Sequence, residues 1–172
     1  MSVHPELPEL HRPIAVDRVT AAGQEWEVKA EATELAAIAR RLGVPAVKKL
    51  SCRFWVSRPA QSKGGVILAE GHLRVSMTRE CVVSLENFTA VHEERFRVRF
   101  VPSGTETEDE DPESDDEIPY GATMIDLGEA AVEQLALSLD PYPRKPGAEL
   151  PPEASDAPSG PFSALAGLVP KS

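Results

Sequence analysis

The stretch from Arg95 to Phe100 alternates strictly, with an arginine at every odd position and an apolar residue at every even one. A period of two is typical of a β-strand with one buried and one exposed face. We therefore expect its apolar side chains to enter a core, while Arg95, Arg97 and Arg99 stand together on the opposite face. Two interpretations are open: a solvated sheet face whose arginines pair with acidic neighbours, or a surface that binds an anion.

A second alternating stretch, Lys48–Arg58, carries the other candidate binding residues. Its polar face includes Lys49, Arg53 and Trp55, whereas Cys52 falls on the apolar face and is predicted to be a small core residue. An exposed tryptophan beside cations is suited to stacking on a nucleic-acid base while the cations hold phosphates. A loop that covers the indole is the alternative. The candidate RNA-binding residues are therefore Lys49, Arg53, Trp55, Arg95, Arg97 and Arg99.

Hydrophobic periodicity predicts two helices, Thr33–Leu42 and Asp126–Leu139, because both place apolar residues three and four positions apart on one face. The remaining apolar patterns have the two-residue period of strands, with a bulge expected at Gly71 and the strand pattern continuing through Val82–Leu85. We expect strands at Pro13–Val16, Trp26–Ala30, Lys48–Arg58, Val66–Glu70, Leu73–Cys81 and Val91–Val101. The predicted fold class is α+β: an antiparallel sheet, partly curled towards a barrel, with two packed helices.

Charge divides the chain into two parts. Residues 1–104 contain 15 Lys and Arg against 12 Asp and Glu, whereas residues 105–172 contain 3 against 16. The formal net charge of −10 therefore does not argue against nucleic-acid binding by the first part. We expect one domain over residues 12–147, interrupted by a disordered acidic loop at 104–118, and a flexible proline-rich tail at 148–172.

Nine of the thirteen residues in 105–117 are Asp or Glu, and the interval lacks the EF-hand spacing of a calcium site. Three roles stay open for it: solubilisation, an internal competitor for RNA that folds over the basic face, or attraction of a basic protein. The tail ends in apolar residues at short helical spacing, which usually dock on a partner or on the parent domain. The candidate partner-binding residues are Phe162, Leu165 and Leu168.

Neither cysteine belongs to a catalytic motif or a disulfide framework. Cys81 can be paired on paper with His72 or His92, but the sequence pattern places it inside a strand, as a packed thiol. No glycine-rich phosphate loop is present either, so we expect no enzymatic activity and no cofactor. The two cysteines are far apart in the sequence, and no apolar run reaches membrane-spanning length or resembles a signal peptide. We therefore expect a cytoplasmic protein without a membrane partner.

Four segments, taken with their order and spacing, resemble the YceD family of large ribosomal RNA subunit accumulation proteins. They are Leu50–Phe54, Leu73–Cys81, the Ile125–Glu129 start of the second predicted helix, and Pro161–Leu165. The acidic interval that precedes this helix also fits the family layout. The Asp-Pro-Tyr-Pro-Arg sequence at Asp140–Arg144 is similar to that of alphaproteobacterial members.

The resemblance implies a role in large-subunit ribosome biogenesis, through accumulation or processing of 23S rRNA, and no known enzymatic activity. In some family members the position of Cys81 begins a C-x-x-C pair, which resembles part of a zinc site. Here the run is Cys81-Val82-Val83-Ser84 and no Cys or His follows the second helix, so we expect no metal. The expected partner is 23S rRNA or its precursor. The alternative is a chaperone-like module that holds a basic ribosomal protein of the large subunit through the acidic loop and the tail.

Overall fold

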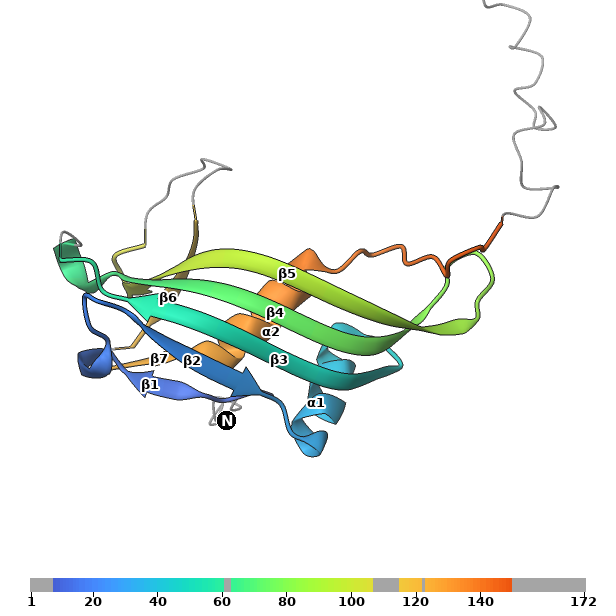
Figure 1. The fold of residues 1–172 in the computed structure, drawn as a ribbon, viewed down its shortest axis with the longest axis horizontal. Coiled ribbons are helices and arrows are strands. Elements are labelled where there is room, and N and C mark those ends of the chain that lie inside the picture. Colours follow the sequence, from blue (N-terminus) through green and yellow to red (C-terminus); the bar gives the residue numbers. More distant parts are fainter. Residues whose placement is uncertain (1–7, 61–62, 107–114, 122, 150–172) are drawn as a thin grey trace, which may run out of the picture.

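The computed structural model describes residues 8–60, 63–106, 115–121 and 123–149. These residues form a five-stranded sheet, a two-stranded sheet and two α-helices, which confirms the predicted α+β class (Figure 1). The elements are β1 (Pro13–Ala15), η1 (Val16–Arg18), β2 (Gln24–Lys29), α1 (Ala32–Leu42), β3 (Ala46–Ser57), η2 (Lys63–Gly65), β4 (Ile67–Glu80), β5 (Asn87–Pro102), β6 (Asp116–Tyr120), β7 (Met124–Asp126) and α2 (Leu127–Ser138).

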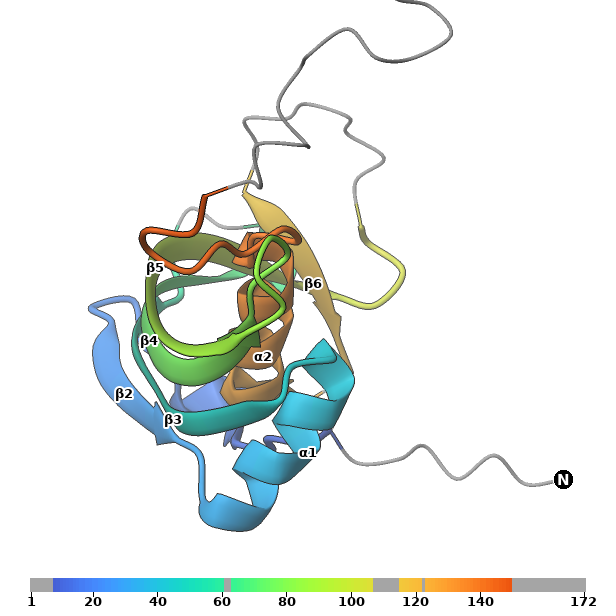
Figure 2. The same cartoon turned by 90° about the vertical axis from the view of Figure 1, so that its right-hand side faces the viewer.

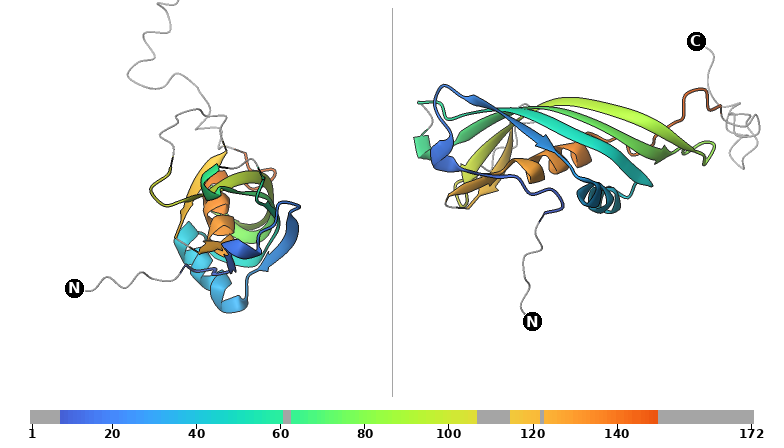
Figure 3. Two further views of the ribbon diagram at one scale, coloured as in Figure 1. Left: turned by 90° about the vertical axis from the view of Figure 1, so that its left-hand side faces the viewer. Right: turned by 60° about the horizontal axis from the view of Figure 1, so that its bottom comes forward.

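The large sheet is open, with the strand order β2-β3-β4-β5-β6. Its first four strands are antiparallel neighbours, as predicted, whereas β6 pairs in parallel with β5 and only over Val98–Pro102. Strand β1 pairs with β7 in the small sheet instead. The expected curl is present without closure of a barrel: Figures 2 and 3 show the sheet curving around α2.

Helix α2 lies against the concave side of the sheet because most of its residues are apolar. Leu127, Ala131 and Leu135 are at most 1% exposed and belong to one core with the inward-facing residues of β3, β4 and β5. The predicted core residue Cys52 is fully buried, and burial raises its pKa to about 12. Strands β3 and β4 bury every second side chain, so their alternate residues form the opposite, exposed face of the sheet.

Strand β4 runs without interruption through Gly71, so the predicted bulge at this glycine is wrong. The glycine is needed for a close approach instead, since a Cβ there would lie 2.2 Å from Cζ of Phe96. The rings of Phe54 and Phe96, from the strands on either side, meet edge to face with their centroids 5.6 Å apart. The irregularity of the sheet lies elsewhere, in β3 between Val47 and Lys49.

The predicted strand at Val82–Leu85 is also wrong, because these residues form the tight connection between β4 and β5. The amide of Leu85 donates to the carbonyl of Cys81 at 2.8 Å, and the amide of Cys81 donates to the carbonyl of Glu86 at 2.9 Å. Valine and leucine have the apolar character of a strand, but the backbone reverses here through Leu85, whose φ is +57°.

The N-terminal segment is held against the start of α2. Asp126 caps this helix by accepting hydrogen bonds from the amides of Gly128 at 2.9 Å and Glu129 at 3.2 Å, and it also accepts one from the amide of Arg12. Glu129 of the Asp-x-x-Glu motif forms an ion pair with Arg41 of α1 at 2.8 Å. The cap thus ties the N-terminal segment and both helices together.

Candidate nucleic-acid interface

The strand register places the six predicted RNA-binding residues on one face of the sheet, the face turned away from α2 (Figure 1). Two cross-strand rows on β3, β4 and β5 bring four of them together: Trp55 with Glu70 and Arg97, and Arg53 with His72 and Arg95. The other two lie outside these rows. Lys49 is opposite Ser76, two rows further along, and Arg99 is opposite Leu68.

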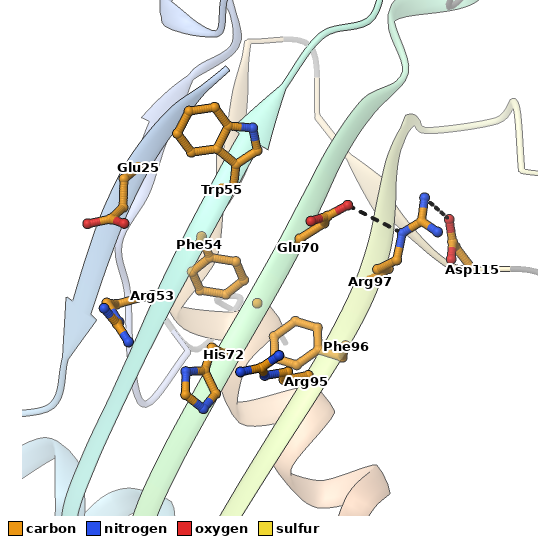
Figure 4. Close-up of a pocket in the computed structure, with 11 residues that line it drawn as sticks. Glu25, Arg53, Phe54, Trp55, Glu70, His72, Arg95, Phe96, Arg97 and Asp115 are labelled. Carbon is orange, nitrogen blue, oxygen red and sulfur yellow. Dashed lines mark ion pairs between the residues drawn. The ribbon is translucent and has the colours of Figure 1, made fainter. Parts of the chain in front are cut away.

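The two rows border a shallow trough of about 610 Å³ (Figure 4). Its floor is the sheet itself at Phe54, Gly71 and Phe96, which lie in register between the rows. Glu25 of β2 and Asp115 lie at its two ends. Successive rows are about 7 Å apart along a strand, and neighbouring strands are about 4.8 Å apart. The trough is therefore wide enough for a flat ring and open enough for a polymer to pass through.

The three arginines of β5 differ in how they are neutralised. Arg97 lies 3.7 Å from Glu70 and 3.6 Å from Asp115, and Arg99 lies 3.2 Å from Glu117, whose side chain is largely buried. In the described part of the chain, neither Arg53 nor Arg95 has a carboxylate within 4.0 Å or a side-chain hydrogen bond. Arg97 and Arg99 thus pair with acidic neighbours, as the first interpretation of the arginine ladder predicts. Arg95 is exposed, and anion binding stays a prediction.

Trp55 is 49% exposed, and a turn covers one edge of its ring, whereas stacking on a base stays a prediction. Gly23, with a φ of +75° in the turn before β2, lies against one edge of the indole, and a Cβ there would be 2.6 Å from Nε1. Only a glycine fits this approach. The turn therefore fixes the ring in place and leaves the rest of it facing the solvent beside the trough.

Acidic residues also lie on the cationic face of the sheet. Glu25 and Glu70 flank Trp55 in register, and Glu93 pairs with Arg74 on the same face at 3.2 Å. Sequence reasoning also missed His72, because the bulge assigned to Gly71 broke the alternation that places His72 on this face. The unbroken alternation from Glu70 to Arg74 was the signal that could have found it.

Cys81 lies at the start of the β4–β5 turn, not inside a strand as predicted, although it is fully buried. The hydroxyl and amide of Ser84 and the amide of Lys145 hydrogen-bond to its sulfur and lower its pKa from 9.0 to about 7. Among the described residues no group of three or more His, Cys, Asp or Glu is arranged to hold a metal ion. These hydrogen bonds make the thiolate a structural acceptor that joins the turn to the segment after α2.

Replacing Cys81 by alanine is expected to cost more stability as the pH rises from about 7 to about 9. The folded pKa is lowered, so the thiolate form adds stability above the unfolded value of 9.0, and this contribution is lost as the pH falls through 7. Urea unfolding of both proteins across this range, under reducing conditions, measures the difference. The matched Cys52→Ala variant is expected to show no such rise, because burial keeps that thiol protonated. A pH-independent difference for Cys81→Ala would contradict the lowered pKa.

The remaining candidate residues lie outside the described part of the chain. Phe162, Leu165 and Leu168 are not among the described residues, and neither is most of the acidic interval. Of that interval, residues 105–106 and 115–117 are described, and among them Asp115 and Glu117 form ion pairs with Arg97 and Arg99. The described helices include none that is long and apolar enough to cross a membrane.

Fold and site together define an α+β protein whose open sheet presents a cation-bearing trough. A family model described as large ribosomal RNA subunit accumulation protein YceD matches residues 69–168, more than half of the chain. The chain belongs to the YceD family, as its sequence segments indicated. Neither a search of curated proteins nor a search of solved structures found a match. The matched region includes Glu70, His72 and the arginines of β5, while Arg53 and Trp55 precede it.

The family name implies a role in the accumulation of large-subunit ribosomal RNA, and it describes no catalytic activity.

Proposed function

We propose that this protein promotes the accumulation of 23S rRNA in the cytoplasm by binding the RNA, or its precursor, directly and without catalysis. The observation that carries the proposal is the row Arg53–His72–Arg95 on one exposed face. Its two arginines form no ion pair within the described residues, and they come from strands whose backbones are about 10 Å apart. Neighbouring cations repel one another, and RNA phosphates relieve this repulsion while releasing counterions.

Trp55 and Arg97 support the same assignment from the neighbouring row. A half-exposed indole next to guanidinium groups suits the stacking of an unpaired base, and single-stranded RNA segments offer such bases. The ion pairs of Arg97 are long, at 3.6 and 3.7 Å, and its side chain is 59% exposed. Exposed pairs of this kind contribute little to stability, so Arg97 can exchange its carboxylates for a phosphate.

The test is the binding of 23S rRNA fragments by the full chain over a series of salt concentrations. Changing Arg95, Arg97 and Arg99 together to serine is expected to weaken binding at least about tenfold and to reduce the slope of log affinity against log salt by about 1 to 2. Lys145→Ser is the control, because Lys145 pairs with Glu86 at the β4–β5 hairpin, away from the trough. The proposal fails if the triple variant leaves both affinity and slope unchanged.

A further inference from the structure

The trough is not purely cationic, although a surface that binds only backbone phosphates gains nothing from carboxylates. Glu25, Trp55 and Glu70 lie side by side in register on β2, β3 and β4. Both carboxylates line the trough with Arg53 and Arg95 (Figure 4), where they repel any phosphate bound there. Their position on either side of the indole suggests that they contact another part of the ligand.

The two rows that border the trough differ in their balance of charge, although neither has charges of one sign alone. Arg97 lies in the row of Trp55 and Glu70, and Glu27 of β2 is opposite Arg53 in the other row. One row holds an aromatic ring between two acceptors, since neighbouring strands place Glu25 and Glu70 each about 5 Å from Trp55 at the backbone. The other row, about 7 Å away, holds Arg53, His72 and Arg95. A flat ring stacked on the indole would thus meet carboxylates at its edge, with cations one row away for an attached phosphate.

Carboxylates accept hydrogen bonds and do not donate them, which selects among the bases. Guanine presents two neighbouring donors on its Watson–Crick edge, N1–H and the 2-amino group, and these match the two oxygens of one carboxylate. Uracil presents a single donor between two carbonyl oxygens, which a carboxylate repels. Adenine and cytosine each place one amino group beside an acceptor nitrogen. Guanine is therefore the base with the best fit to an ionised Glu25 or Glu70.

We propose that the trough is a subsite for an unpaired guanine in single-stranded RNA, an inference that rests on the proposed RNA-binding function. The base stacks on Trp55, its Watson–Crick edge donates to Glu70 or Glu25, and the adjoining phosphate lies among Arg53, His72 and Arg95. A guanine in a duplex is excluded because base pairing occupies the same edge.

The subsite predicts a base preference that short oligonucleotides can measure. Uridine oligonucleotides with one central guanosine are expected to bind the full chain about tenfold or more tightly than all-uridine ones, because two hydrogen bonds to a charged acceptor are gained. A central inosine, which lacks the 2-amino group, is expected to lose most of this gain. Fluorescence anisotropy with labelled oligonucleotides at low salt gives all three affinities.

The double variant Glu25→Gln with Glu70→Gln tests the assignment of the carboxylates. It is expected to bind the all-uridine oligonucleotide at least as well as the wild type, since two repulsive charges are removed, but to lose the preference for guanosine. Glu93→Gln is the control. Glu93 lies on the same sheet face and pairs with Arg74 outside the trough, so its loss is expected to leave the preference intact.

Two outcomes overturn the subsite: equal affinities for the three oligonucleotides, or a guanosine preference that survives in the double variant. If wild-type binding is salt-dependent but indifferent to the base, RNA binding stands and the guanine subsite is wrong. If neither the oligonucleotides nor the 23S rRNA fragments bind, the RNA-binding function itself is wrong, and the subsite with it.

Discussion

Replacing Arg53 and Arg95 together by serine is expected to weaken binding to 23S rRNA by about 10- to 100-fold, since each arginine can form charge-assisted hydrogen bonds to a phosphate. If each arginine contacts one phosphate of a single strand, the slope of log affinity against log salt concentration falls by about 1.4. The effect is expected to be large because, within the described residues, both guanidinium groups stand without a carboxylate partner. Filter binding or anisotropy at several salt concentrations measures affinity and slope together.

The matched control is the pair Arg97→Ser and Arg99→Ser, which removes the same two charges from the same sheet face. A smaller loss of affinity is expected here, because Arg99 is held by Glu117 and Arg97 is shared between Glu70 and Asp115. Equal losses of affinity for the two double variants would mean that RNA binding depends only on the overall charge of the sheet face. A larger loss for the control pair would move the binding site towards β6.

Changing Gly128 to alanine is expected to lower the free energy of unfolding by about 2 to 3 kcal/mol. A Cβ at this position would lie 2.3 Å from the carbonyl oxygen of Leu10 and 2.9 Å from the amide nitrogen of Arg12. Both are backbone atoms that cannot rotate away, and Leu10 is itself fully buried in the core. The N-terminal segment must therefore move off the start of α2 to make room.

The sign of the change in the free energy of unfolding tests this contact, because replacing glycine by alanine in a helix ordinarily stabilises a protein by about 0.5–1 kcal/mol. Urea unfolding followed by circular dichroism gives the free energy, and Gly121→Ala is the control. A Cβ at Gly121 meets nothing within 4 Å, so this second variant is expected to stay within about 0.5 kcal/mol of the wild type. A stabilised or unchanged Gly128→Ala protein would show that the N-terminal segment is not held there.

The sequence predicted the elements whose patterns depend on local periodicity alone. The alternation in β5 located a strand with Val98 and Phe100 in the core, and the apolar stripe of α2 located the helix that fills the sheet. Phe96 was placed on the correct face, although it is only partly buried. These features are readable because each residue's face follows from its neighbours in the chain.

Features that depend on pairing between distant segments were missed. The close contact of Phe96 with Gly71 requires knowledge of which residue lies opposite in the next strand, and without it the glycine was taken for a bulge. The ion pairs of Arg97 were missed for the same reason, because Glu70 comes from β4 and Asp115 from the segment before β6. The six candidate residues were assigned to one face, but neither their division into paired and unpaired cations nor His72 was predicted.

The short β6 leaves most of β5 as a sheet edge. It covers only Val98–Pro102, so within the described residues no strand pairs with this side of Asn87–Arg97. Uncovered edges invite stacking between copies of a protein and the growth of aggregates. Here Glu93, Glu94 and Arg95 follow one another along that edge, and an intermolecular ladder through them would have to desolvate charges on both faces at once. These charged side chains, of which Arg95 also lines the trough, are of the kind that disfavours edge-to-edge pairing between copies of a protein.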